Sequence, residues 1–161
     1  MGAAVTAAVT VMTVPGCAFV FNRVEVVEDD SAVDAAFQRV LDSRAPARLG
    51  DVITQAGLPF GSWDRMYTFS SMVESDEIND KLGTDAYWTG LPGNSDGSVQ
   101  VFVNGNEAVG AYYDTVPGHG VLGDDAYATP DSAATPTSEV EIDQVTQQPT
   151  TFWYIEIEEF S

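Results

Sequence analysis

The stretch Ser98–Asp114, SVQVFVNGNEAVGAYYD, decides the fold. Apolar side chains alternate with other residues on both sides of Asn104-Gly105, and this period of two is typical of half-buried strands. Asn-Gly readily takes the positive φ angles of a tight turn whose twist suits two antiparallel strands. The stretch therefore predicts a β-hairpin whose inward face carries Val99, Val101, Val103, Val109, Ala111 and Tyr113.

The residues before this hairpin predict one strand and three short helices. Arg65–Ser70 alternates with Tyr67 and Phe69 on one face, as a strand does. The helices are expected where a capping residue opens an apolar pattern of helical period and a Gly or Pro follows it. They are Ser31–Arg44 before Pro46, Asp51–Ala56 before Gly57, and Ser75–Leu82, with Ser75 as the cap, before Gly83.

The C-terminal third combines a low-hydrophobicity segment with a final strand. Residues 115–150 are rich in Pro, Gly, Thr, Ser and Asp, and Thr129–Ser138 holds no aliphatic residue larger than Ala. Thr151–Phe160 then has strong strand chemistry. We expect one α+β domain over 22–161 with a flexible acidic loop over 115–150. Its core is a small antiparallel sheet of about four strands with two or three short helices on one face.

Residues 1–21 carry no charged side chain and predict a signal peptide or membrane anchor. About a dozen apolar residues precede Pro15, the length of a signal-peptide core. Val14-Pro15-Gly16-Cys17, at 14–17, resembles a bacterial lipobox, which makes Cys17 the expected lipid attachment. No Lys or Arg precedes the apolar run, so two alternatives stay open. They are an uncleaved anchor and a first element of a soluble core.

The charge of the chain excludes several classes of function. It has 25 acidic and 6 basic residues, a formal net charge of −19, and residues 82–161 contain no Lys or Arg. Such a chain is unsuited to nucleic acid or to electrostatic docking on anionic lipid. A single cysteine excludes a disulfide scaffold. The acidity itself is also typical of adaptation to salt.

Few residues suggest catalysis or metal binding. His119, between two glycines, suits a general base only if a nucleophile and an orienting carboxylate lie near it. The loop carboxylates Asp114, Asp124, Asp125 and Asp131 are the candidates for a weak divalent-cation site. Asn94–Gly97 fails the spacing of a calcium loop and indicates a turn. We expect no cofactor and no metal.

Two features suggest contact with a partner or internal pairing. Frequent aromatic residues indicate an exposed patch for a partner, since neighbouring strand residues face opposite sides. Asp64 and Arg65 should therefore also point apart, and Arg65 should pair with an acid on an adjacent strand. The candidate partner surface consists of Trp63, Tyr67, Tyr87, Trp88, Tyr112 and Trp153.

The pattern W-D-R-x-Y-x-F at Trp63–Phe69, followed by Glu77-Ile78, supports an envelope location. It resembles the W-D-[KR]-x-Y-x-F strand of small secreted or lipid-anchored bacterial α+β domains, over about a third of the chain. The chain is also similar to small envelope lipoproteins that act as accessory subunits of membrane complexes. The resemblance implies a fold and a location but no activity.

Together these features predict an extracytoplasmic lipoprotein at the cell membrane. It would be a non-catalytic binding or accessory subunit of an envelope complex, anchored by Cys17, with no nucleic-acid partner. Two alternatives stay open. One is a small hydrolase that uses His119 with a loop carboxylate, and the other is a soluble, salt-adapted cytosolic protein.

Overall fold

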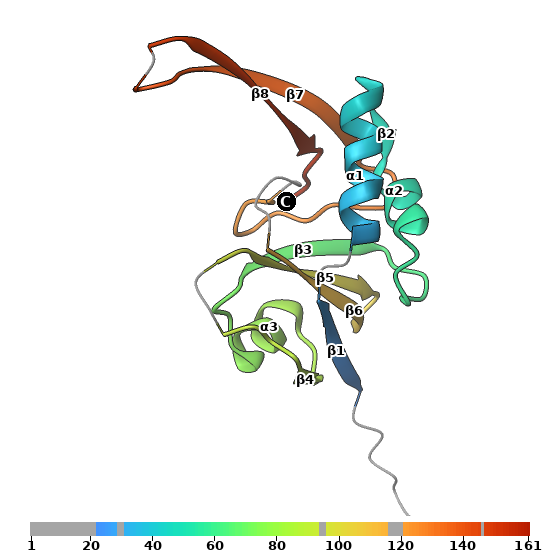
Figure 1. The fold of residues 1–161 in the computed structure, drawn as a ribbon. Helices are drawn as coiled ribbons and strands as arrows, with labels where there is room; N and C mark the ends of the chain where they lie inside the picture. Colours follow the sequence, from blue (N-terminus) through green and yellow to red (C-terminus); the bar gives the residue numbers. More distant parts are fainter. Residues whose placement is uncertain (1–21, 29–30, 94–95, 116–120, 146) are drawn as a thin grey trace, which may run out of the picture.

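The computed structural model describes residues 22–28, 31–93, 96–115, 121–145 and 147–161. Cys17 and His119 lie outside the described residues. Figure 1 shows an α+β fold with helices interspersed among strands. The elements are β1 (Arg23–Glu28), α1 (Ser31–Ser43), β2 (Ala47–Arg48), α2 (Leu49–Ala56), β3 (Arg65–Ser70), α3 (Ser75–Leu82), β4 (Tyr87–Thr89), β5 (Ser98–Asn104), β6 (Glu107–Asp114), β7 (Ala133–Ile142) and β8 (Pro149–Ile157).

The larger sheet has five strands in the order β3-β5-β6-β1-β4. β3, β5 and β6 are antiparallel neighbours, whereas β1 runs parallel to both β6 and β4. The expected α+β class is therefore confirmed, but a single antiparallel sheet of about four strands is wrong. The direction of β1 could not be predicted, because side-chain alternation is the same in parallel and antiparallel strands.

The central hairpin is present with two differences from the expected geometry. Asn104 is the last residue of β5 and pairs with Glu107, so the turn residues are Gly105 and Asn106. Of these only Gly105 has a positive φ, 62°, as in turns with Gly at the first central position. Val109 is an extra residue between the partners of Phe102 and Val103. This bulge turns Val109 to the opposite face, and Ala108 takes its place beside Val103.

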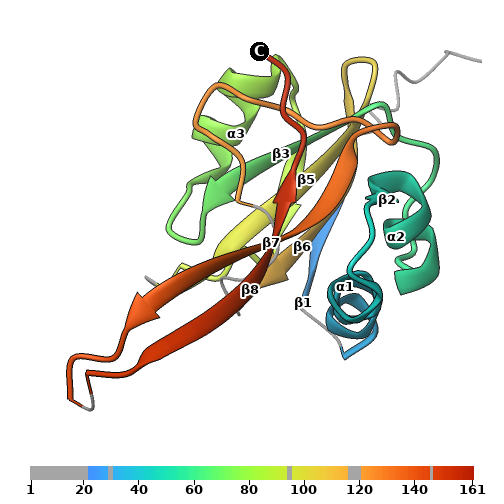
Figure 2. The same cartoon turned by 90° about the horizontal axis from the view of Figure 1, so that it is seen from above.

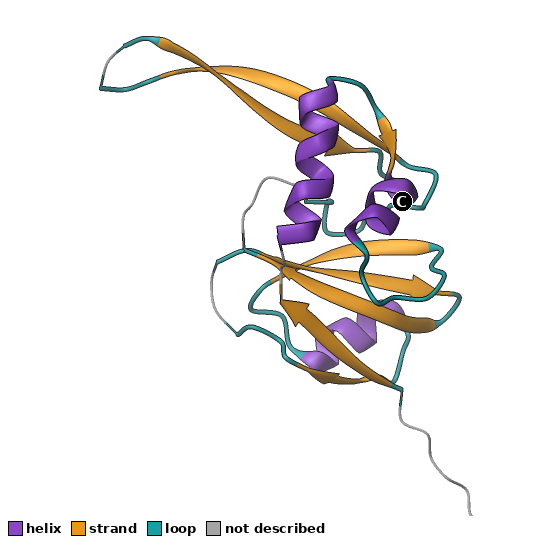
Figure 3. Ribbon diagram, turned by 45° about the vertical axis from the view of Figure 1, so that its right-hand side comes forward, coloured by secondary structure: helices purple, strands orange, loops and turns teal. Residues whose placement is uncertain are grey.

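Helices cover both faces of the larger sheet, not one face as expected (Figure 3). α1 and α2 pack with Phe102 and Tyr112 in one apolar cluster. Ile78 of α3 packs with Val99 and Val101 in the second cluster, on the other face. Residues 98–103 of β5 are consequently all buried, because successive side chains enter different cores.

The helix predictions are confirmed at most of their ends. The α1 residues Val33, Phe37, Val40 and Leu41 are buried, as their spacing predicts. Gly57 and Gly83 end α2 and α3 in the left-handed conformation, with φ of 69° and 65°. Ser75 is not the cap of α3, because it is already helical. Glu74 holds that position without a side-chain capping bond.

The smaller sheet, in the order β2-β7-β8, corrects the prediction of a loop over 115–150. Ala133–Ile142 is strand β7, and β8 already begins at Pro149. The small residues that suggested a linker allow close backbone packing instead: Ser132 and Ala134 are fully buried. The amides of Leu49 and Gly50, at the start of α2, donate to the carbonyls of Ser132 and Pro130, both at 2.9 Å.

β7 and β8 form a long hairpin, residues 133–157, which we call the arm. At its base Ala134, Ile155 and Ile157 belong to the apolar cluster under α1 and α2. Farther out the two strands project beyond the rest of the molecule (Figures 1 and 2). β1 begins at the opposite end from the arm (Figures 1 and 3). No helix in the described part of the chain is both long and apolar enough to cross a membrane.

Candidate functional site

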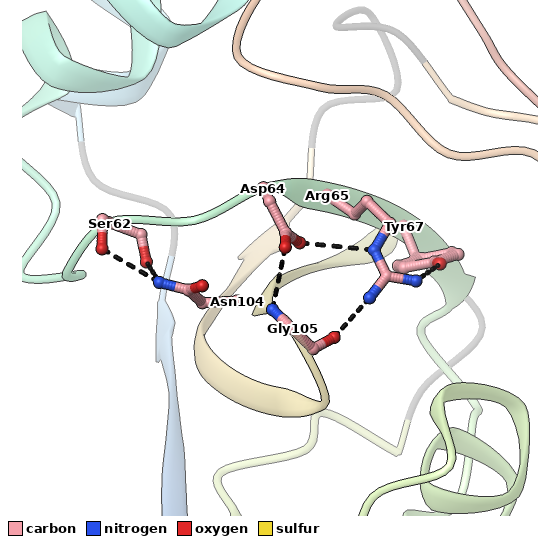
Figure 4. Close-up of polar contacts among 6 residues, drawn as sticks. All are labelled: Ser62, Asp64, Arg65, Tyr67, Asn104 and Gly105. Atoms are coloured by element: carbon pink, nitrogen blue, oxygen red, sulfur yellow. Dashed lines mark hydrogen bonds and ion pairs between the residues drawn. The ribbon is translucent and has the colours of Figure 1, made fainter.

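Asp64 and Arg65 hold the turn of the central hairpin (Figure 4). The Gly105 amide donates to Asp64 Oδ2 at 2.8 Å, and the Arg65 guanidinium donates to the Gly105 carbonyl. Arg65 Nε also donates to Asp64 Oδ1 at 3.3 Å, and its Nη1 donates to the Tyr67 hydroxyl at 3.2 Å. The two side chains thus close around the main chain of one turn residue.

This geometry corrects the prediction that Asp64 and Arg65 point apart. Asp64 precedes β3, so strand alternation does not govern the pair, and Arg65 uses Asp64 in place of an acid on a neighbouring strand. Partial burial lowers the pKa of Arg65, but the hydrogen bonds to Asp64 and Tyr67 outweigh it and leave that pKa raised. The pair therefore stabilises the turn of the hairpin.

The six aromatic residues predicted as a partner surface do not form one patch. Tyr112 and Trp88 are buried, at 1% and 6% exposure, so their assignment to a surface is wrong. Trp63 is half-buried and packs edge-to-face on Phe102 with ring centroids 5.1 Å apart. Composition could not separate these residues, because the sheet is covered on both faces.

Tyr67, Tyr87 and Trp153 lie in three separate places. Tyr67 is half-buried, with its ring centroid 6.0 Å from that of Tyr127. Tyr87 is exposed on β4, at the end of the molecule opposite the arm (Figure 1). Trp153 is exposed on the arm, and the guanidinium of Arg44 lies 3.5 Å from its ring centroid. Of the predicted surface, Trp153 alone lies in the exposed part of the arm.

The burial of Trp88 depends on Asn79 of α3. Asn79 Oδ1 accepts hydrogen bonds from the Trp88 indole at 3.0 Å, the Ala86 amide at 3.1 Å and the Thr84 hydroxyl at 2.8 Å. Its Nδ2 donates to the Ala86 carbonyl at 3.0 Å. One amide side chain therefore joins α3 to β4.

The loop carboxylates do not gather into a site. Asp125 pairs with Lys81 on the α3 side of the sheet, and Asp131 pairs with Arg48 beside α2. Asp114 is buried at the end of β6. The hydrogen bond and charge of Lys81 lower the pKa of Asp125. Among the described residues, no three His, Cys, Asp or Glu side chains are grouped closely enough to hold a metal ion.

The exposed apolar side chains are concentrated on the arm. Nine large hydrophobic residues are exposed in the described chain, and five of them lie there: Val140, Ile142, Val145, Phe152 and Trp153. The prediction of a loop over 115–150 concealed three of these, Val140, Ile142 and Val145. The alternation of Glu139-Val140-Glu141-Ile142 was the signal that could have found Val140 and Ile142.

The arm is also strongly acidic. Glu139, Glu141 and Glu156 share one face of the hairpin, opposite the face that carries Val140 and Ile142. Glu139 pairs in register with Phe152, and its carboxylate accepts a hydrogen bond from the Tyr154 hydroxyl at 3.3 Å. Partial burial and the charges of Glu139 and Glu156 raise the pKa of Tyr154. The arm thus combines exposed apolar side chains with a negative field.

No protein-family model matches the chain, and no curated protein or solved structure is significantly similar to it.

Proposed function

We propose that this chain is a non-catalytic binding subunit of an envelope complex, held at the extracytoplasmic face of the cell membrane by a lipid on Cys17. The observation that carries the binding role is the arm, with its five exposed apolar residues. Isolated two-stranded hairpins are only marginally stable in water, and exposed strand edges and apolar patches are typical of contact surfaces. A partner that covers the arm would pair its open strand edges and remove its apolar side chains from water.

The position of the arm suits an anchored subunit. β1 begins at Arg23, two residues after the segment 1–21, and lies at the end of the molecule opposite the arm (Figures 1 and 3). A chain attached through Cys17 would therefore hold the arm away from the membrane surface. This arrangement supports the anchoring proposed from the lipobox-like 14–17.

The anchor is tested by fractionating cells that produce the full-length chain or Cys17→Ala. We expect the wild type in the membrane fraction, with an acylated Cys17 as its mature N-terminus by mass spectrometry. Cys17→Ala should lose the acyl mass. An intact Met1 and an unmodified Cys17 in a soluble wild-type chain would refute the anchor.

The binding role is tested on wild-type membranes solubilised in mild detergent. After gentle cross-linking, the wild type should migrate in a particle larger than the monomer. A variant that lacks the part of the arm beyond Pro136 and Ile155 should migrate as a monomer. A wild type that migrates as a monomer even after cross-linking would contradict the proposed role.

A further inference from the structure

One face of the arm is buried in the core at its base and exposed farther out, in the part beyond Pro136 and Ile155 that we call the outer arm. Ala134 pairs with Ile157 and Pro136 with Ile155, and side chains of paired residues share a face. Each further step of two residues toward the tip stays on this face. The face therefore carries Trp153 first, then Val140, and then Ile142 paired with Pro149. These four residues, Val140, Ile142, Pro149 and Trp153, are all exposed, and we call them the outer face.

No cation within the arm offsets its charge. Residues 133–157 hold four acids, Glu139, Glu141, Asp143 and Glu156, and no Lys or Arg. The ion pairs Arg48–Asp131, Arg65–Asp64 and Lys81–Asp125 all lie elsewhere in the described part of the chain. Of the six basic residues, Arg39, Arg44, Arg48, Arg65 and Lys81 already contact other groups of this chain. The negative field of the arm is therefore available to a cation from outside.

The chain itself shows the chemistry that the arm accepts. Where the outer face leaves the body, the Arg44 guanidinium lies over Trp153, with its Cζ 3.5 Å from the ring centroid. An arginine guanidinium over an aromatic ring is a favourable cation–π arrangement. Beyond Trp153 the same face offers Val140 and Ile142 without such a cover.

The strand edges of the arm suit an extended ligand. β2 pairs with β7 only at Ala133 and Ala134. Beyond Ala134 that edge of β7 faces no other strand of the described chain. Open edges accept an additional strand through main-chain hydrogen bonds, and alternate side chains then provide specificity.

We propose that the arm binds an extended basic segment of a partner protein. Apolar side chains of that segment cover the outer face, and its Arg or Lys side chains reach the carboxylates of Glu139 and Glu141. This inference rests on the proposed binding role and adds the chemistry of the partner. A second copy of the chain or an anionic membrane is disfavoured, because either would bring like charges against the four acids.

The test uses the full chain labelled with 5-fluorotryptophan. The chain has three tryptophans, and each gives a separate fluorine signal. Trp153→Phe assigns the arm signal. The probes are synthetic ten-residue peptides that alternate Arg with Val, Glu with Val, or Ser with Val. We expect the Arg–Val peptide alone to bind, and its binding to shift the Trp153 signal while Trp63 and Trp88 stay unchanged. Affinity should fall as salt is added, because exposed charges are screened.

Two variants of the arm and one matched control locate the contact. Val140→Ser/Ile142→Ser should weaken the Arg–Val peptide about tenfold or more, since apolar anchors dominate binding. Glu139→Gln/Glu141→Gln should weaken it about threefold to tenfold and flatten its salt dependence. Asp80→Asn/Asp85→Asn removes the same charge at α3 and beyond it, and should change affinity less than about twofold. All six residues are exposed, so folding is preserved.

Several results would overturn the inference. They are equal binding of the Arg–Val and Glu–Val peptides, a shift confined to Trp63 or Trp88, and an effect of Asp80→Asn/Asp85→Asn equal to that of the arm pair. A dimer abolished by Val140→Ser/Ile142→Ser would show that a second copy covers the face. An acylated chain in a larger particle that ignores all three peptides would refute this inference alone. An unmodified, soluble chain whose arm binds Arg–Val would refute only the anchor.

Discussion

The stack of Arg44 on Trp153 couples the arm to the end of α1, and substitutions at Arg44 can measure that coupling. Arg44 follows α1 with a φ of 54°, in the left-handed region where helices commonly place glycine. An arginine there strains the backbone, while its guanidinium covers the Trp153 ring. Arg44→Ala removes the stack and keeps the strain, whereas Arg44→Gly removes both.

The two substitutions should therefore differ in stability. An exposed cation–π contact contributes about 0.5–1 kcal/mol. A non-glycine residue in the left-handed conformation costs about 1 kcal/mol relative to glycine. Arg44→Ala should thus lower the free energy of unfolding by about 0.5–1 kcal/mol, and Arg44→Gly should leave it within about 0.5 kcal/mol of the wild type. The expected order runs against the usual penalty for glycine.

Urea unfolding of the four chains of a double-mutant cycle, Arg44→Ala with Trp153→Ala, gives the coupling directly. We expect about 0.5–1 kcal/mol, because the two groups touch. The fluorine signal of Trp153 in wild type and Arg44→Gly reports in addition whether the ring becomes more exposed. A coupling below about 0.2 kcal/mol would refute the stack. Equal stabilities for Arg44→Ala and Arg44→Gly would refute the backbone strain assigned to Arg44.

Substitutions at three further positions test the packing and the arm. Asn79→Ala should cost about 2–4 kcal/mol in urea unfolding because it removes four hydrogen bonds, and Asn79→Asp, which keeps the acceptor, should cost less. Gly110→Ala should cost about 1–3 kcal/mol, since the new Cβ would lie 2.1 Å from Phe60 Cδ1; an unchanged stability would contradict that packing. Glu139→Gln should lower the raised pKa of Tyr154 toward its ordinary 10.0 in an ultraviolet titration. Because the folded chain holds this proton more tightly, stability should fall as pH rises above 10, and less steeply in the variant.

Signals confined to a few neighbouring residues predicted the structure well. Arg65–Ser70 and Ser75–Leu82 have the bounds expected from alternation and from the left-handed Gly83. α1 buries the predicted stripe, because a period of 3.6 places those residues on one side of any helix. The central hairpin was recognisable for the same reason, although its turn is displaced by one residue.

Long-range pairing was not accessible from these signals. Nothing in the valines of β1 distinguishes an edge strand from one inserted in parallel between β6 and β4. Ser132 and Ala134 resemble linker residues in composition, yet both are buried, because α2 bonds to the backbone of Ser132 and β2 pairs with Ala134. Small residues favour both a loose chain and a tight contact, and only the neighbouring elements decide between them.

The candidate surface was predicted at one position and missed at most others. Aromatic residues were weighted because they often form contacts, but Trp88 and Tyr112 supply the two cores of a sheet covered on both sides. The strand chemistry of β8 makes Trp153 accessible to prediction. Val140 and Ile142 escape prediction, because the composition of residues 115–150 indicates a loop where β7 lies.

Salt adaptation explains the carboxylates of the arm but not its exposed apolar side chains. A high density of Asp and Glu keeps a protein soluble in salt, and exposed carboxylates in any position serve this purpose. Large apolar side chains between those carboxylates do the opposite, because strong salt increases the cost of exposing them to water. Val140 and Ile142 alternate with Glu139 and Glu141, so the same short segment carries both the negative charge and the exposed apolar side chains. A contact with a basic, partly apolar partner accounts for the combination, whereas solubility alone accounts only for the charge.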